Sequence, residues 1–206
     1  TYMLASGVKL KPDTEIIPIV VDMDRSNGDT LRTKSLITRY RDIRKMSYTD
    51  NPKEGFFSAN LKSLASYKTT NFKGHIKDDF QLDFGNIDET FYQYIDAEQL
   101  DDINQKFLES LFDNSQPPTE GSSGTSSTEL HLKLSHGFKG NPNIGSIIFN
   151  DLIYTDEYRY FEDICGEKDK VFIVSSIFGG TGSSGYPQLV KNIRNSDKNT
   201  VKNVHI

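Results

Sequence analysis

Two stretches of the chain combine glycines with hydroxyl or basic side chains, which is the composition of loops that hold phosphate. The first runs from Val171 to Arg194, VFIVSSIFGGTGSSGYPQLVKNIR, and the second from Ser135 to Phe149, SHGFKGNPNIGSIIF. Glycines let backbone N–H groups approach an anion without an intervening Cβ. A helix that starts at the end of such a loop adds unpaired donors and a partial positive charge. The chemistry expected of both stretches is therefore the binding of phosphate groups.

The first stretch predicts a strand, a loop and a helix in that order. The apolar, β-branched run Val171–Val174 is typical of a buried strand. Pro187 is expected in the first helical turn, ahead of the apolar Leu189, Val190 and Ile193. The candidate phosphate-binding residues of the intervening loop are Gly179, Gly180, Thr181, Gly182, Ser183 and Ser184. A flexible glycine turn without a ligand is the plainer alternative.

In the second stretch, glycines again precede the start of a helix. Asn141 is a good N-cap and Pro142 a good first helical residue, and the helix is expected to run to about Asp163. Lys139 adds a positive charge beside any bound anion. The candidate residues that face phosphate are Gly137, Gly140, Asn141 and Pro142. An ordinary capped helix start is the alternative.

Both loops resemble signature loops of the tubulin/FtsZ superfamily of GTPases. FGGTGSSG, residues 178–185, resembles the family's GGGTGSG loop, with Phe178 in place of its first glycine and Ser184 in place of its last. GFKGNPNIG, residues 137–145, resembles the family's GxGxNPxxG loop, with Lys139 in place of a small residue. The pattern is neither a Walker A loop nor a dinucleotide fingerprint. The resemblance implies GTP or GDP as ligand, accompanied by Mg²⁺, and a full-length protein that acts as a GTPase and assembles into filaments.

Two acidic residues end an earlier predicted strand, in the sequence VVDMD from Val20 to Asp24. Doubly wound sheets bind ligands at the carboxyl ends of their strands, and hard cations take carboxylate oxygens. By the family resemblance, Asp22 and Asp24 are candidates for positions near the nucleotide or its metal. VVDMD also resembles the DxDGT motif of haloacid-dehalogenase-type phosphatases, although Arg25-Ser26 replaces Gly-Thr. In that remote alternative Asp22 is the nucleophile and Asp24 the acid.

The order of the expected elements predicts an α/β fold with a Rossmann-like, mainly parallel sheet flanked by helices. One sheet is expected to contain both Ile19–Val21 and Val171–Val174, with a helix from Asp29 to about Lys45 between them. The resemblance implies that residues 1–206 are the first, N-terminal half of a bacterial-type nucleotide-binding domain. This fragment alone is expected to be inactive, because the family's first glycine loop is missing from it.

Residues 51–127 match neither glycine motif and are expected to be an α-rich insertion without which the fold can close. Within them, residues 96–112 predict a helix with one apolar face, and residues 115–128 have the composition of a linker. Just after them, residues 129–134 alternate apolar and polar side chains, which predicts a strand leading into the second glycine loop.

Bulk composition excludes several other classes of function. The formal net charge of −5 argues against general nucleic-acid binding, which needs a basic face. No apolar run approaches the ~20 residues of a membrane span. The single cysteine, Cys165, indicates a reducing compartment, so a cytoplasmic location is expected. A second hypothesis stays open: a scaffold or interaction protein that keeps the fold without hydrolysis, favoured by Phe178 and by the 51–127 insertion.

Overall fold

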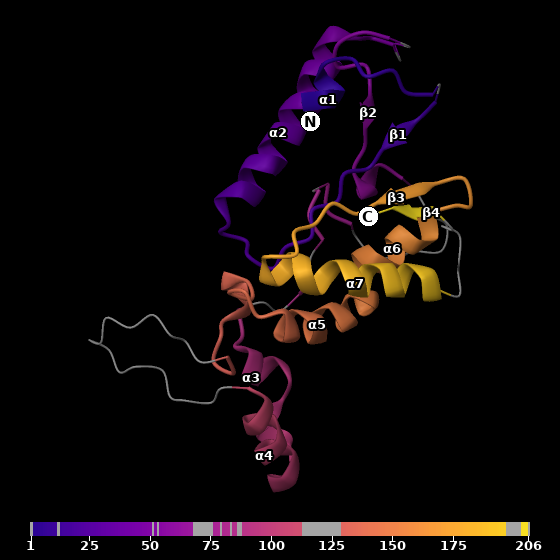
Figure 1. Cartoon of the computed structure of the whole chain (residues 1–206). Coiled ribbons are helices and arrows are strands. Elements are labelled where there is room, and N and C mark those ends of the chain that lie inside the picture. Colours follow the sequence, from indigo (N-terminus) through magenta and orange to yellow (C-terminus); the bar gives the residue numbers. More distant parts are fainter. Residues whose placement is uncertain are drawn as a thin grey trace. The chain divides into compact units, whose positions relative to one another are not determined.

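The structure is a computed structural model, and it describes residues 2–11, 13–50, 52, 54–67, 76–78, 80–82, 84–85, 88–112, 129–196 and 203–205. The chain divides into two compact units. Unit 1 comprises residues 1–22, 26–82 and 156–164, and unit 2 comprises residues 23–25, 83–155 and 165–206. Each unit combines helices with one short parallel pair of strands, which is an α/β arrangement (Figure 1).

Unit 1 is built on one long helix, α2 (Gly28–Ser47). Asn27 caps it, because its side-chain oxygen accepts a hydrogen bond of 2.9 Å from the backbone nitrogen of Asp29. The inward face of α2 packs Ile37 and Tyr40 into a core with Ala59, Leu61 and Phe80. The other elements of this unit are α1 (Tyr2–Ala5), β1 (Glu15–Ile16), β2 (Asn60–Leu61), η1 (Leu64–Ser66) and α6 (Asp156–Ile164). β1 pairs in parallel with β2.

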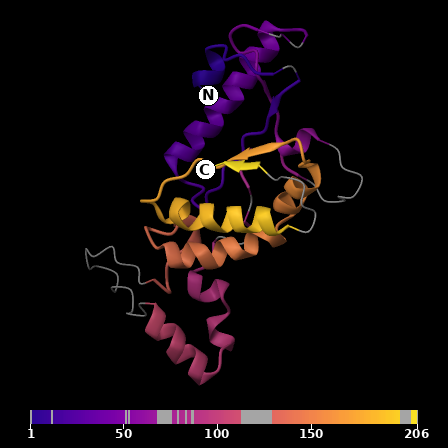
Figure 2. The same ribbon diagram turned by 45° about the vertical axis from the view of Figure 1, so that its right-hand side comes forward.

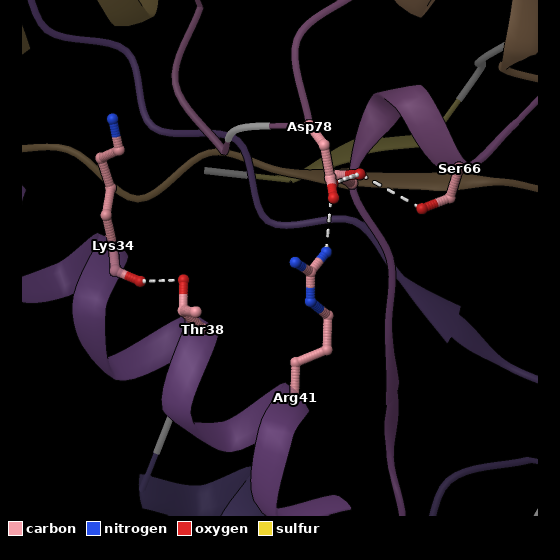
Figure 3. A network of polar contacts seen from close by, with 6 residues as sticks. Lys34, Thr38, Arg41, Ser66 and Asp78 are labelled. Atoms are coloured by element: carbon pink, nitrogen blue, oxygen red, sulfur yellow. Dashed lines mark hydrogen bonds and ion pairs between the residues drawn. The ribbon is translucent and has the colours of Figure 1, made fainter. Parts of the chain in front are cut away.

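A polar network fixes the segment around residue 78 on α2, as Figure 3 shows. Arg41 Nη1 donates to Asp78 Oδ1 at 3.1 Å, and Ser63 Oγ donates to the same oxygen at 2.6 Å. The Arg41 guanidinium also lies 5.1 Å from the centre of the Phe80 ring. The hydrogen bonds from Ser63 and Arg41 hold the pKa of Asp78 below its ordinary value.

Unit 2 is centred on α5 (Pro142–Asp151) and α7 (Gly180–Asn195), which lie side by side in both views (Figures 1 and 2). β3 (Lys170–Phe172) pairs in parallel with β4 (Asn203–His205). The remaining elements are α3 (Phe91–Tyr94), η2 (Ala97–Gln99), α4 (Asp102–Leu111), η3 (Leu134–His136) and η4 (Leu152–Tyr154). The most deeply buried apolar side chains of this unit include Phe91, Leu130, Leu134, Ile144 and Leu152.

The prediction of one sheet is wrong for the described residues. β1 takes its partner from residues 60–61, Val20 forms an isolated parallel bridge with Gln81, and β3 pairs with β4. Ile19–Val21 and Val171–Val174 therefore do not share a sheet. The predicted strand Val171–Val174 is also not buried, since Phe172 is 69% exposed and Val174 is 97% exposed. An apolar run is buried only where another layer covers it, and β4 is the one strand paired with β3 in the described chain.

The helix boundaries also differ from those predicted. The helix expected from Asn141 to Asp163 ends at Asp151, continues as η4, and resumes as α6, which belongs to unit 1. α7 starts at Gly180 and contains Pro187 in its interior instead of in its first turn. The strand expected at residues 129–134 is reduced to an isolated antiparallel bridge between Lys133 and Thr90, followed by η3.

The described part of the predicted insertion contributes to the cores of both units. Leu61 and Phe80 lie in the core of unit 1, and Phe91 is fully buried in unit 2. Asn51 and the linker-like residues 115–128 lie outside the described residues. Deletion of residues 51–127 would remove these buried side chains, and the expectation that the fold closes without this range stays a prediction.

Candidate functional site

The first glycine loop ends at the start of α7. The backbone of Gly179 is extended, with φ −98° and ψ 153°, and the helix begins at the next residue. Ser175 Oγ donates to the carbonyl oxygen of Gly182 at 2.9 Å, which fixes the exposed loop on the first turn of the helix. The N-cap residue, Gly179, has no side chain that could cap this helix start. Its first backbone N–H groups are therefore of the kind that bind anions at helix starts.

The second glycine loop ends at the start of α5. Three of its residues have positive φ: Gly137 at 70°, Lys139 at 44° and Gly140 at 84°. The predicted positions of Asn141 as the N-cap and Pro142 in the first turn are confirmed. However, the Asn141 side chain makes no capping hydrogen bond within the described chain. Neither of the two N-cap residues, Gly179 and Asn141, therefore caps its helix through a side chain.

The two helix starts lie against each other. A Cβ on Gly180 would lie 2.8 Å from Phe138 Cβ, 3.1 Å from the backbone nitrogen of Gly140 and 3.3 Å from that of Asn141. Glycine at position 180 permits this approach, since a real Cβ atom essentially never lies within 3.0 Å of such a neighbour and this one would lie 2.8 Å from Phe138 Cβ. The approach brings two positive helix ends into one neighbourhood. The exposed residue Lys139 belongs to the same loop as Gly140.

Three other glycines are explained by packing inside unit 2. A Cβ on Gly182 would overlap the carbonyl oxygen of Ser176, and a Cβ on Gly185 would lie 2.6 Å from the Phe149 ring. A Cβ on Gly145 would overlap the hydroxyl of Ser184. Each of these positions excludes larger residues for reasons internal to the chain, so none of them by itself indicates a ligand.

Gly179 differs from these glycines. A Cβ at this position would meet no described atom within 4 Å, and its φ of −98° is one that any residue adopts. Nothing in the described part of unit 2 therefore requires glycine there. An anion bound at the helix start would supply the missing reason, because a side chain at position 179 would occupy part of its space.

The hydroxyl groups of Ser183 and Ser184 are used within the helix. Ser183 Oγ donates to the carbonyl oxygen of Gly179 at 2.6 Å, and Ser184 Oγ donates to that of Gly180 at 2.6 Å. Ser184 is only 2% exposed and lies between α7 and α5. Thr181 is half-buried in the same first turn. Of the three predicted hydroxyl donors, the structure assigns Ser184 to packing.

The two predicted acidic residues fall in different units. Asp22 belongs to unit 1, where its Oδ2 accepts hydrogen bonds from Thr30 Oγ1 at 3.1 Å and Asn27 Nδ2 at 3.3 Å. Asp22 therefore helps to position the start of α2. Asp24 belongs to unit 2, and its Cβ would lie 3.5 Å from a Cβ on Gly137, so it lies beside the second glycine loop. In the described part of the chain, no group of three or more His, Cys, Asp or Glu side chains could hold a metal ion.

Sequence reasoning missed Phe138, which supports both loops from inside. It is 1% exposed, it would contact a side chain at either Gly180 or Gly145, and its ring lies 6.1 Å from that of Phe149. The available signal was a large apolar residue set between glycines in an otherwise polar loop. Phe138 therefore fixes the position of the loop that carries Lys139 and Gly140.

Comparisons with family models, with curated proteins and with solved structures found no match to this chain. Among the helices that the structure describes, none is both long and apolar enough to cross a membrane. The tubulin/FtsZ assignment accordingly stays a prediction from the residues of the two glycine loops and from their order along the chain.

Proposed function

We propose that the chain binds the phosphate groups of a nucleotide where the starts of α5 and α7 meet. The observation that carries this proposal is the close approach of Gly180 to Gly140 and Asn141. It joins two helix starts, each with roughly half a positive charge and with unpaired backbone donors. Lys139, exposed on the second loop, adds a full positive charge. A polyphosphate is the ligand class that best matches two adjoining anion-binding helix ends.

GTP or GDP is the proposed nucleotide, and the reason is the resemblance of both loops to those of the tubulin/FtsZ superfamily. Magnesium is proposed to accompany the phosphates, and Asp24, beside Gly137, is the candidate carboxylate on the same unit. Assembly into filaments and GTP hydrolysis in the full-length protein follow from the same resemblance and belong to the same proposal. We assign no catalytic residue to the hydrolysis.

Gly179 gives the sharpest test, because it separates a ligand requirement from a packing requirement. Gly179→Val should leave the fold intact, since its Cβ meets no described atom within 4 Å. It should weaken binding of GTP by at least tenfold, because the loss of one charge-assisted hydrogen bond costs about 1.5–3 kcal/mol. Affinity is measured by titration calorimetry with GTP and GDP, and the fold by circular dichroism.

Gly28→Ala is the matched control, because it also adds a Cβ that meets no described atom but does so in α2 of unit 1. Its affinity for GTP should equal that of the wild type. Equal affinity of Gly179→Val and wild type would exclude the start of α7 as the phosphate site. Failure of the wild-type protein to bind either nucleotide would favour the alternative, an interaction protein that keeps the two loops without a ligand.

A further inference from the structure

α4 presents an apolar face that no described part of the chain covers. Ile103, Phe107 and Leu111 are four residues apart, so they lie on one side of the helix. Their exposed fractions are 80%, 62% and 56%, and the helix has no buried residue. Within unit 2, α4 lies at the end away from α7 in both views (Figures 1 and 2). An amphipathic helix ordinarily buries such a stripe, so this surface is a candidate interface.

α2 carries a second exposed face, which adjoins the side of the helix that packs into the core of unit 1. Its members are spaced by alternating steps of four and three residues, which is the spacing of a seam between two helices. They are Arg32, Leu36, Arg39, Ile43 and Met46, all exposed. Ile37 and Tyr40 are buried on the adjoining side of the helix, and Tyr40 lies one turn from both Leu36 and Ile43. The aliphatic parts of arginine side chains extend the apolar surface of such a face.

Charge selects one pairing of these two faces. Residues 96–111, which include α4, contain five acidic residues and one lysine, whereas α2 contains six basic and two acidic residues. Pairing α4 with α4, or α2 with α2, would bring like charges together, which is unfavourable. We propose that the α4 face of one copy of this chain docks on the exposed α2 face of a second copy. This interface does not depend on the proposed nucleotide.

The proposed contact joins different surfaces of the two copies, so a docked pair keeps one unused α2 face on one copy and one unused α4 face on the other. Interfaces of this type form rings or open chains instead of closed dimers. A single short helix face is smaller than the ~800 Å² per partner of a standard interface, so the association should be weak and concentration-dependent. It should also weaken with added salt, because its selectivity is electrostatic.

Sedimentation velocity over rising protein concentration, at low and at high salt, tests this proposal. Wild-type protein should form species larger than dimers at low salt and dissociate at high salt. Phe107→Glu should lower the association constant by about tenfold or more, as expected for an aromatic side chain at an interface centre. Arg39→Glu should do the same. Both residues are exposed, so both variants should fold, and circular dichroism is the check on their folding.

Mixing the two variants gives the decisive measurement. Phe107→Glu keeps an intact α2 face and Arg39→Glu keeps an intact α4 face, so the mixture should form a one-to-one pair and nothing larger. Lys45→Glu, on an exposed side of α2 outside the seam, makes the same charge change as Arg39→Glu and should associate like the wild type.

Three results would overturn the proposal. The first is a wild-type chain that stays monomeric at every concentration, which would leave the α4 face to a different partner. The second is association that only one of the two face variants weakens, since that indicates a symmetric contact. The third is equal weakening by Lys45→Glu and Arg39→Glu, which would mean that net charge, and not the proposed seam, controls association.

Discussion

Gly145→Ala should destabilise the packing of α5 against α7. The new Cβ would overlap Ser184 Oγ and would lie 2.8 Å from Ser184 Cβ and 2.9 Å from the Phe138 ring. The Ser184 hydroxyl cannot rotate away without losing its 2.6 Å hydrogen bond to the carbonyl oxygen of Gly180. Alanine gains up to about 1 kcal/mol in helix propensity. Overpacking costs about 1–3 kcal/mol and the lost hydrogen bond about 0.5–1.5 kcal/mol, so after the gain in helix propensity a net destabilisation of about 0.5–3.5 kcal/mol is expected.

The chain has no tryptophan, so circular dichroism is the suitable probe of thermal and urea unfolding. The melting temperature should fall by about 2–4 °C for each kcal/mol lost. Ser184→Gly in the Gly145→Ala background removes the overlapping atoms and should recover part of the stability. Gly28→Ala, whose Cβ meets no described atom within 4 Å, should not lower the melting temperature. An unchanged or higher melting temperature for Gly145→Ala would refute the close packing of α5 on α7.

Three further substitutions test the two units. Asp78→Asn should lower stability slightly at neutral pH but not in acid. Hydrogen bonds from Ser63 and Arg41 lower the pKa of Asp78, so the stability that its carboxylate contributes is present above the ordinary pKa of 3.8 and is lost as pH falls through the lower pKa of the folded state. Unfolding experiments at a series of acidic pH values measure this loss. Tyr94→Phe should cost about 0.5–1.5 kcal/mol through the lost 2.8 Å bond to Asp151 Oδ2. Burial, and then Asp151, raise the pKa of Tyr94, so the wild-type advantage should persist below pH 10.0 and decline at higher pH in alkaline unfolding experiments. Phe80→Ala should cost about 3–5 kcal/mol in thermal unfolding, because Phe80 is buried in the core of unit 1 with Ile37 and Tyr40.

Features specified by local sequence could be predicted. The helix expected from Asp29 to about Lys45 is found as α2, Gly28–Ser47, because its apolar spacing and its polar start are encoded within the helix itself. The Asn141-Pro142 helix start is correct for the same reason. The helix expected within residues 96–112 is found as η2 and α4, with Asp101 as the N-cap of α4.

Features that depend on distant partners could not be predicted. The apolar content of Val171–Val174 predicted burial, but burial requires a covering layer that no local pattern specifies. Pro187 predicts the first turn of the last helix, because proline suits that position, but α7 starts at Gly180, although glycine and serine have low helix propensity. Tertiary packing overrides that preference here, since the small residues from Gly180 to Gly185 are what allow α7 to contact Phe138 and Phe149. No signal in the strand sequence itself identifies residues 60–61 as the partner of β1.

The glycine pattern that suggests a phosphate site has two physical explanations, and the structure separates them by position. Gly145, Gly180, Gly182 and Gly185 each face an atom that would collide with a side chain, so their identity follows from packing whether or not a ligand binds. Gly140 meets no described atom within 4 Å, but its φ of 84° favours glycine by itself. A loss of binding on substituting Gly182 would therefore be ambiguous, because displacement of Ser176 produces the same result. Gly179 has neither a neighbouring atom nor a positive φ to explain it, and it is the N-cap of α7, where glycine is favoured over valine, so a binding defect at this position indicates the ligand when the variant keeps its fold and its stability.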